Sequence, residues 1–276
     1  MSASVLACGR FQLDLSRPLI MGILNVTPDS FSDGGSYLDA SQALARAEQM
    51  IAQGADIIDI GGESTRPGAL EVSVQQELDR VMPVLEGVLA LQVPVSVDTR
   101  KSEVMRAVLA AGADMVNDVG ALEDEGALAV VAASSAAVCL MHKQGNPDAM
   151  QSAPKYVDVV AEVGDYLLER AMLAESAGIA RNRIMIDPGF GFGKTLEHNI
   201  QLLRKLADLA ERGLPVLVGL SRKSMLGAIT GNAVDSRQFE SVAAALLAIQ
   251  RGAVVVRVHD VKPTKDAIKI MEKIGL

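Results

Sequence analysis

The sequence predicts a single α/β domain folded as a (β/α)8 barrel, and three observations lead to this prediction. Five apolar periodic runs stop at a glycine, and a strand-like run follows each within a few residues, at 56–60, 115–119, 184–186, 216–220 and 254–258. Three further runs, at 19–25, 95–98 and 137–142, fit the same template without the glycine. The runs end in polar or glycine residues. Eight strands joined by helices predict a parallel sheet, and eight strands close such a barrel.

The remaining elements follow in order along the chain. A short hairpin is expected over residues 5–15, where it would plug the amino end of the barrel. The first helix is expected to begin near Asp39, a candidate N-cap with Gln42 three residues later. Further amphipathic helices, which would pack outside the sheet, are expected at 73–89, 102–111, 126–133, 157–177, 196–211, 239–251 and 264–274.

Length and composition bound the class of protein. The 276 residues contain no linker or composition shift, so we expect one domain over residues 1–276. The hydrophobic content of 49% suits strands that are buried on both faces. No apolar stretch approaches the roughly 18 residues that span a bilayer, and the first residues lack a signal-peptide pattern. Two cysteines, Cys8 and Cys139, make no disulfide framework, so we expect a cytoplasmic protein without a membrane partner.

The net charge of the whole chain differs in sign from the charge expected at the predicted rim. The net charge of −8 argues against a nucleic-acid partner, which usually requires a basic face. Five cations nevertheless lie at or just past predicted strand ends: Arg66, Lys194, Arg222, Lys223 and Arg257. Local positive charge of this kind favours an anionic ligand at the rim.

Side chains that suit a flat, nitrogen-rich ring gather at the predicted strand ends. Asn25, Asp98, Asn117 and Asp187 end four of the strands, and Lys223 follows a fifth. Carboxylates accept hydrogen bonds from ring N–H and amino groups, amides donate and accept, and lysine donates to a carbonyl. The alternative interpretation is that each acid or amide simply caps the next helix.

Glycine-rich segments, at 25–35 and 187–195, contain further candidate ligand-binding residues. Phe31, Phe190 and Phe192 lie in such segments, where they would stack on a ring or serve as local hydrophobic anchors. Residues 187–195 resemble a P-loop, but Pro188 occupies a required glycine position, so we reject a nucleotide-triphosphate site. The three histidines form no sequence cluster, which argues against a multi-histidine metal site. A Mg²⁺ held by Asn25 and substrate phosphates is compatible with the sequence.

With these residues assembled, the chain resembles the dihydropteroate synthase family of pterin-binding barrels from about Leu19 to its C-terminus. The resemblance rests on segments 25–35, 61–68, 96–100, 117–118, 141–142, 187–194, 219–224 and 257–260. It implies condensation of 6-hydroxymethyl-7,8-dihydropterin diphosphate with p-aminobenzoate, release of diphosphate, and inhibition by sulfonamides. Lys143 departs from the family pattern, which more often has an apolar residue there, outside the expected ligand contacts.

The resemblance also implies roles for individual residues. The pterin would be bound by Asp98, Asn117, Asp187 and Lys223, in a slot lined by Met141, Phe192 and Gly219. The diphosphate would be held by Thr65, Arg66, Arg257 and His259, with Asn25 on Mg²⁺. The p-aminobenzoate site would be bordered by Phe31, Pro67 and Ser224. As a physical hypothesis, the bond between the pterin methylene carbon and the diphosphate would break before the amine attacks, with Asp98 and Asp187 stabilising the cationic ring and Asp33 assisting.

Three other functions are compatible with parts of the sequence. Lys223 suits a Schiff-base aldolase, although the neighbouring Arg222 weakly disfavours this. A pterin-binding methyl-transfer domain would share the slot but lack the Arg66 loop. A catalytically silent folate-binding paralogue is the third, and the intact Asp33, Arg66 and Lys223 argue against it. The expected helix at 239–251 is apolar around most of its circumference, and the family resemblance implies a homodimer through the later helices.

Overall fold

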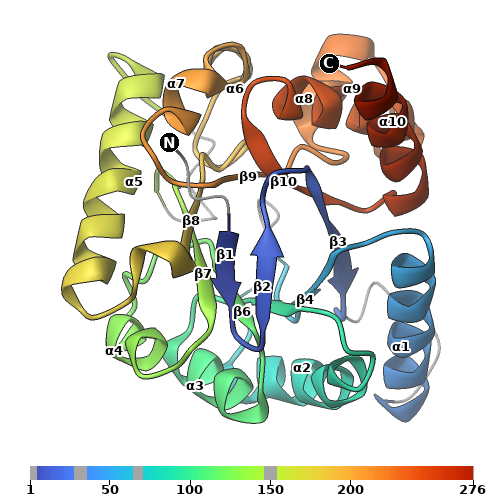
Figure 1. Ribbon diagram of the computed structural model, residues 1–276, viewed down its shortest axis with the longest axis vertical. Helices are drawn as coiled ribbons and strands as arrows, with labels where there is room; N and C mark the ends of the chain where they lie inside the picture. Colours follow the sequence, from blue (N-terminus) through green and yellow to red (C-terminus); the bar gives the residue numbers. More distant parts are fainter. Residues whose placement is uncertain (1–4, 28–35, 65–70, 146–153, 276) are drawn as a thin grey trace.

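The computed structural model describes residues 5–27, 36–64, 71–145 and 154–275, with only the backbone of 36–39 described. Eight parallel strands form a closed barrel in the order β10-β3-β4-β5-β6-β7-β8-β9 (Figure 1). They are β3 (Leu19–Asn25), β4 (Ile57–Gly61), β5 (Val95–Asp98), β6 (Met115–Asp118), β7 (Ala137–Met141), β8 (Ile184–Asp187), β9 (Val216–Val218) and β10 (Ala253–Val258). The predicted barrel is confirmed, and each strand lies within two residues of its predicted bounds.

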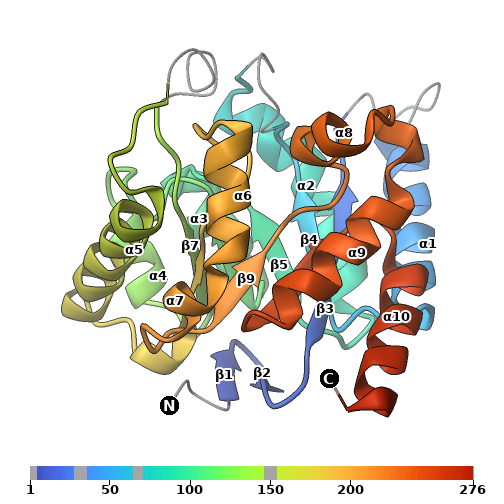
Figure 2. The same ribbon diagram turned by 90° about the horizontal axis from the view of Figure 1, so that it is seen from above.

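The predicted hairpin consists of β1 (Val5–Cys8) and β2 (Phe11–Asp14), which pair antiparallel. It lies across the end of the barrel where the strands begin, as Figure 2 shows from the side. Leu6, Cys8 and Leu13 share a buried cluster with Met21 and Met115 inside the barrel. The hairpin therefore closes the amino end, and the opposite rim is left for a site.

Helices surround the barrel and cover the outer faces of its strands (Figure 1). The α-helices are α1 (Ser36–Ala52), α2 (Val74–Leu89), α3 (Ser102–Ala111), α4 (Ala127–Ala132), α5 (Val159–Ser176), α6 (Leu196–Arg204), α7 (Leu206–Ala210), α8 (Ser224–Thr230), α9 (Gln238–Ile249) and α10 (Val261–Ile274). Two 3-10 turns, η2 (Arg181–Arg183) and η3 (Val234–Ser236), complete the described elements. None of the described helices is long and apolar enough to cross a membrane.

Three expected helices depart from the prediction by an interruption or by more than two residues at one end. Helix α1 begins at Ser36, so Asp39 lies inside it and does not cap it. The expected helix at 196–211 is interrupted at Lys205, whose φ of −107° and ψ of 25° leave the helical region. Helix α10 begins at Val261 because Pro263 falls in its first turn, where a missing N–H is tolerated.

Candidate active site

A polar layer lies above an apolar layer inside the barrel. The apolar layer, which the hairpin covers, includes Ile57, Met115, Met185 and Val255. Side chains alternate along a strand, so the residue two positions further on shares the same face. Those positions carry Asp59, Asn117, Asp187 and Arg257. Strand periodicity therefore places acids, an amide and a guanidinium together at the carboxyl ends of the strands.

Strand register brings two predicted residues next to each other and a third close by. Asn25 pairs with Gly61, Gly61 with Asp98, and Asp98 with Asn117, so the four form one row. A methyl group added to Gly61 would lie 3.5 Å from Asn25 Oδ1 and 3.8 Å from Asp98 Cβ. Glycine at this position therefore keeps the space between the amide and the carboxylate free of a side chain.

Arg257 is the centre of an ion-pair network in this layer. Its Nε donates to Asp59 Oδ2 at 2.6 Å and its Nη2 donates to Asp98 Oδ2 at 2.8 Å. Asn117 Nδ2 donates to the same Asp59 oxygen at 3.2 Å. Asp59, which sequence reasoning missed, thus orients two of the predicted residues. An acid inside an otherwise apolar strand, two residues after Ile57, was the signal that could have revealed it.

The electrostatics of the layer reflect its burial. Burial raises the pKa of Asp98 to about 7, and the Arg257 guanidinium only partly offsets this. Burial alone would lower the pKa of Arg257, but the carboxylates of Asp59 and Asp98 outweigh it, so that pKa is raised. Burial also raises the pKa of Asp187, against the opposing charge of Lys223. Asp98 therefore exchanges its proton near neutral pH.

Lys223 and Phe192 form a second part of the rim, apart from the Arg257 network. The Lys223 ammonium lies 4.5 Å from the centroid of the Phe192 ring and donates to the Phe190 carbonyl. Burial lowers the pKa of Lys223 to about 8, while Asp187 acts in the other direction. Phe192 is half-buried beside the amine, but Phe190 is fully buried in a hydrophobic core cluster. Of the two ring-stacking candidates in this segment, Phe190 is therefore an anchor.

Lys194 is not the rim cation that the sequence suggested. Its side chain is buried, and its Nζ lies 2.9 Å from His142 Nδ1. Burial lowers the pKa of Lys194 to about 7 and that of His142 to about 3. His142 is therefore a neutral imidazole whose Nδ1 accepts from the lysine. The charge of Lys194 faces the protein interior, and the anionic-ligand argument no longer includes it.

Arg222 is also committed to a protein partner. Its guanidinium donates to both carboxylate oxygens of Asp260, at 2.8 and 3.1 Å. Its φ of 59° lies in the left-handed region, a strained conformation for a side chain of this size. His259 Nδ1 lies 2.9 Å from Ser221 Oγ on the same side of the rim. The contacts of Ser221 with His259 and of Arg222 with Asp260 thus hold the segment that precedes Lys223.

The other predicted residues within the described part of the chain occupy the same rim. Met141 is buried at the end of β7, where its Cγ lies 3.2 Å from the position that a Gly189 side chain would take. Gly219 follows β9, and a methyl group there would lie 3.9 Å from Arg257 Cβ. Ser224 is exposed and begins α8, as predicted. Phe31, Asp33, Thr65, Arg66 and Pro67 lie outside the described residues.

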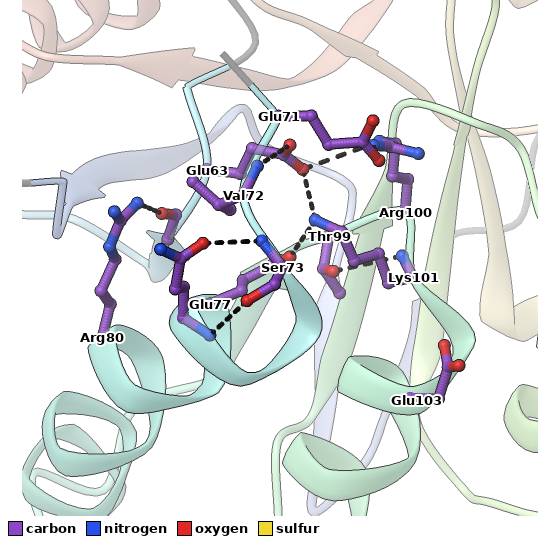
Figure 3. A network of polar contacts seen from close by, with 12 residues as sticks. Glu63, Glu71, Val72, Ser73, Glu77, Arg80, Thr99, Arg100, Lys101 and Glu103 are labelled. Carbon is purple, nitrogen blue, oxygen red and sulfur yellow. Dashed lines mark hydrogen bonds and ion pairs between the residues drawn. The ribbon is translucent and has the colours of Figure 1, made fainter. Parts of the chain in front are cut away.

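A partly buried polar network joins Glu63 and Glu71, which flank segment 65–70, to the turn after β5 (Figure 3). Lys101 Nζ donates to Glu63 Oε2 at 2.8 Å and to Glu77 Oε2 at 2.6 Å. Arg100 binds Glu71 Oε1 at 2.5 Å. Glu77 has no exposed surface, so Lys101 is the cation that makes its burial tolerable. The network fixes the residues that flank the segment and the turn that follows Asp98.

Metal-binding and thiol chemistry have few candidates here. Among the described residues, no group of three or more histidines, cysteines, aspartates or glutamates could hold a metal ion. Cys8 and Cys139 are both free and buried, and burial raises the pKa of each thiol. His198 is half-buried and completes a capping box with Thr195 at the start of α6.

A closed (β/α)8 barrel with buried acids, an amide and a lysine at its carboxyl rim defines a barrel enzyme. The sequence profile described as "Pterin binding enzyme" matches residues 21–259, and the chain belongs to this family.

Known relatives are similar over almost the whole chain. It is 55% identical over 281 residues to dihydropteroate synthase from Neisseria meningitidis serogroup C, covering 100% of this chain and 99% of the relative. The structure of Xanthomonas albilineans dihydropteroate synthase with 4-aminobenzoic acid superimposes with a TM-score of 0.93 at 52% identity, covering 99% and 98% of the two chains. Its complex with 7,8-dihydropteroate gives 0.89 at 50% identity, covering 98% of each chain.

Proposed function

We propose that this enzyme condenses 6-hydroxymethyl-7,8-dihydropterin diphosphate with p-aminobenzoate to form 7,8-dihydropteroate and diphosphate. It is a transferase of folate biosynthesis. The observation that carries this proposal is the polar layer above the apolar one, where Asp98, Asn117 and Arg257 lie in one hydrogen-bonded network. Asp187 and Lys223 complete that layer.

Pterin recognition follows from the chemistry of these groups. The carboxylates of Asp98 and Asp187 would accept from the ring N–H and amino groups, and Asn117 would donate to a ring nitrogen. The Lys223 ammonium would donate to the pterin carbonyl. Because Asp98, Asn117 and Asp187 are buried, a ligand that failed to pair them would leave desolvated polar atoms, which gives strong selectivity. Met141, Phe192 and Gly219 would line the flat faces of the ring.

Diphosphate would be held beside the pterin by Arg257 and His259, together with Thr65 and Arg66. Asn25 would supply one oxygen to Mg²⁺, and its Oδ1 faces the side-chain-free space at Gly61, which suits a cation that keeps most of its ligands from phosphate and water. When bound, the cation would neutralise charge on the leaving diphosphate. An Asn25→Ala variant should lose the Mg²⁺ dependence of diphosphate-ester binding in calorimetry, and retained dependence would contradict this ligand.

The reaction breaks the bond between the pterin methylene carbon and the diphosphate oxygen, and the electron pair leaves with diphosphate. Asp98 and Asp187 would stabilise the cationic ring, assisted by Asp33. The neutral arylamine nitrogen then bonds to the methylene carbon and releases a proton. If cleavage comes first, diphosphate should appear without p-aminobenzoate. Complete absence of that release, with a steep dependence on amine nucleophilicity, would contradict the stepwise order.

The p-aminobenzoate site would lie where Ser224 begins α8, bordered by Phe31 and Pro67. A sulfonamide presents a similar arylamine and a polar group at the other end, so competitive inhibition is expected. Turnover of the two substrates, with equimolar dihydropteroate and diphosphate, tests the assignment. Pterin binding without turnover would favour a silent or methyl-transfer protein. Borohydride trapping of a carbonyl substrate on Lys223 would favour an aldolase.

A homodimer in the cytoplasm is the proposed state of the enzyme. Helix α9 buries Ala244, Ala245 and Ala248 inward but leaves Phe239 80% and Leu247 43% exposed. Apolar side chains exposed on one helix indicate a protein interface, and a second copy of this chain is the proposed occupant. Sedimentation at micromolar concentration should give twice the chain mass, and Phe239→Asp should shift it to one chain mass. A wild-type monomer would contradict the proposal.

A further inference from the structure

The turn at residues 189–193, between β8 and α6, is pressed against the end of β7. Gly189 and Gly193 have positive φ values of 67° and 62°. A methyl group on Gly189 would lie 1.9 Å from the His142 carbonyl oxygen, and one on Gly193 would lie 2.3 Å from the Gln144 carbonyl oxygen. The turn therefore requires glycine for its conformation and for its close backbone approach.

Side chains bind four of the backbone carbonyls in this turn. Lys194 Nζ donates to the carbonyls of Gly189 and Phe192, both at 3.0 Å, and also to His142 O at 3.3 Å. Lys223 donates to the carbonyl of Phe190. The carbonyl of Gly193 accepts from the Tyr156 hydroxyl at 2.9 Å.

Lys194 is the group that links the turn to the rest of the barrel. Only 2% of its surface is exposed, and its Nζ reaches carbonyls on both sides of the turn and the carbonyl and Nδ1 of His142 after β7. An amine in a glycine-rich turn before a helix would bind phosphate in a P-loop. Here four protein acceptors within hydrogen-bonding distance occupy its donors, so the lysine acts on the backbone.

The turn at 189–193 also positions two residues of the predicted pterin site, Phe192 and Lys223. Phe192 belongs to it, and the Lys223 amine rests against both the Phe192 ring and the Phe190 carbonyl. A Gly191 methyl group would lie 3.4 Å from Lys223 Cδ, so the stem of the lysine also packs on the turn. A shift of the turn would move the ring and the amine together.

We propose that Lys194 is a positioning residue for pterin binding, because its buried ammonium ties the turn at 189–193 to β7 and so fixes Phe192 and Lys223. This inference rests on the proposed function. The lysine does not contact the reacting atoms. Its loss should weaken pterin binding selectively, since none of the residues that border the p-aminobenzoate site lies in the turn at 189–193.

The test uses Lys194→Met, which keeps the aliphatic stem, and Lys194→Ala, with Lys269→Met on the exposed side of α10 as control. Michaelis constants are measured separately for pterin diphosphate and for p-aminobenzoate. We expect Lys194→Met to raise the pterin constant by about tenfold or more and the p-aminobenzoate constant by less than about twofold, because displaced groups lose aligned contacts. Ethylammonium ions should restore part of the pterin affinity of Lys194→Ala, but not change the control.

Each other outcome contradicts the inference. An unchanged pterin constant in a folded Lys194→Met protein would show that the turn holds its place without the ammonium. Equal losses for both substrates, or failure of both variants to fold, would make Lys194 a general structural residue. A wild-type protein that neither binds pterin nor turns it over would overturn the proposed function and this inference with it, whereas wild-type turnover with unaltered variants would overturn this inference alone.

Discussion

Replacing Asp59 should separate the orientation of Arg257 from the chemistry of the rim. Asp59 has no exposed surface, and its Oδ2 accepts from Arg257 at 2.6 Å and from Asn117 at 3.2 Å. Asp59→Ala removes two hydrogen bonds to a carboxylate, one from the Arg257 guanidinium and one from the Asn117 amide, each worth about 1.5–3 kcal/mol. Arg257 keeps its bond to Asp98. Loss of the buried Asp59 charge itself offsets part of this cost, so we expect the free energy of unfolding to fall by about 3–5 kcal/mol.

The same substitution should lower kcat/KM for pterin diphosphate by about 100-fold, because a guanidinium without its second partner no longer has one orientation. Asp59→Asn keeps an acceptor oxygen and should cause smaller losses of both stability and activity. Asp165→Ala is the control, since Asp165 is 75% exposed in its pair with Arg212, and it should change stability by less than about 0.5 kcal/mol. Urea denaturation and steady-state kinetics measure both effects. Wild-type kinetics in Asp59→Ala would refute the orienting role.

Four further predictions follow from the same geometry. Lys223→Met should weaken pterin binding about 100-fold, yet it should raise Tm by about 2–4 °C because it removes a desolvated ammonium. Titration calorimetry measures the affinity and a thermal melt measures Tm. A lower Tm would contradict the prediction. Pterin affinity should rise as the pH passes about 7, where Asp98 loses its proton, and fall above about 8, where Lys223 loses its own. Because the folded pKa of Asp98 is raised, the free protein should also lose stability as the pH rises from 3.8 to about 7. A pterin affinity that does not change with pH would contradict the first statement, and an unfolding free energy that does not change with pH would contradict the second. Gly189→Ala should reduce the free energy of unfolding by about 3 kcal/mol or more in a denaturant titration. By contrast Gly178→Ala, also at positive φ but with nothing within 4 Å, should cost about 1 kcal/mol, and equal losses would exclude the close-approach argument. Lys101→Met should lower the unfolding free energy by about 3–5 kcal/mol because it leaves the buried Glu77 carboxylate without its cation, and a change below about 1 kcal/mol would contradict that.

The sequence predicted the barrel well because each strand is an apolar run that can be recognised from its own residues, and five of the eight runs follow a glycine that ends a helix. A helix that ends at Gly112, followed by the apolar residues from Met115, needs no knowledge of distant parts of the chain. Once eight such units are counted, topology alone places Asp98, Asn117 and Asp187 at one rim. Their convergence could therefore be predicted before any contact was known.

What the sequence could not reveal depends on distant partners. Asp59 differs from its strand neighbours as an acid in an apolar run, but its role depends on the position of Arg257, 198 residues later. Lys194 carries a charge next to glycines, which in the sequence resembles an anion site, but its amine donates to the carbonyl of His142, directly after β7. Phe190 and Phe192 are two residues apart in the same glycine-rich segment, yet one is in the core and one at the rim.

Titration calorimetry with 6-hydroxymethyl-7,8-dihydropterin diphosphate examines most directly whether these side chains form one pterin pocket. We predict one saturable site per chain in the wild-type protein and at least about 100-fold weaker binding in Asp187→Asn, which loses a buried charged acceptor. Wild-type protein that binds no pterin, or an Asp187→Asn variant that binds it with unchanged affinity, would contradict the account.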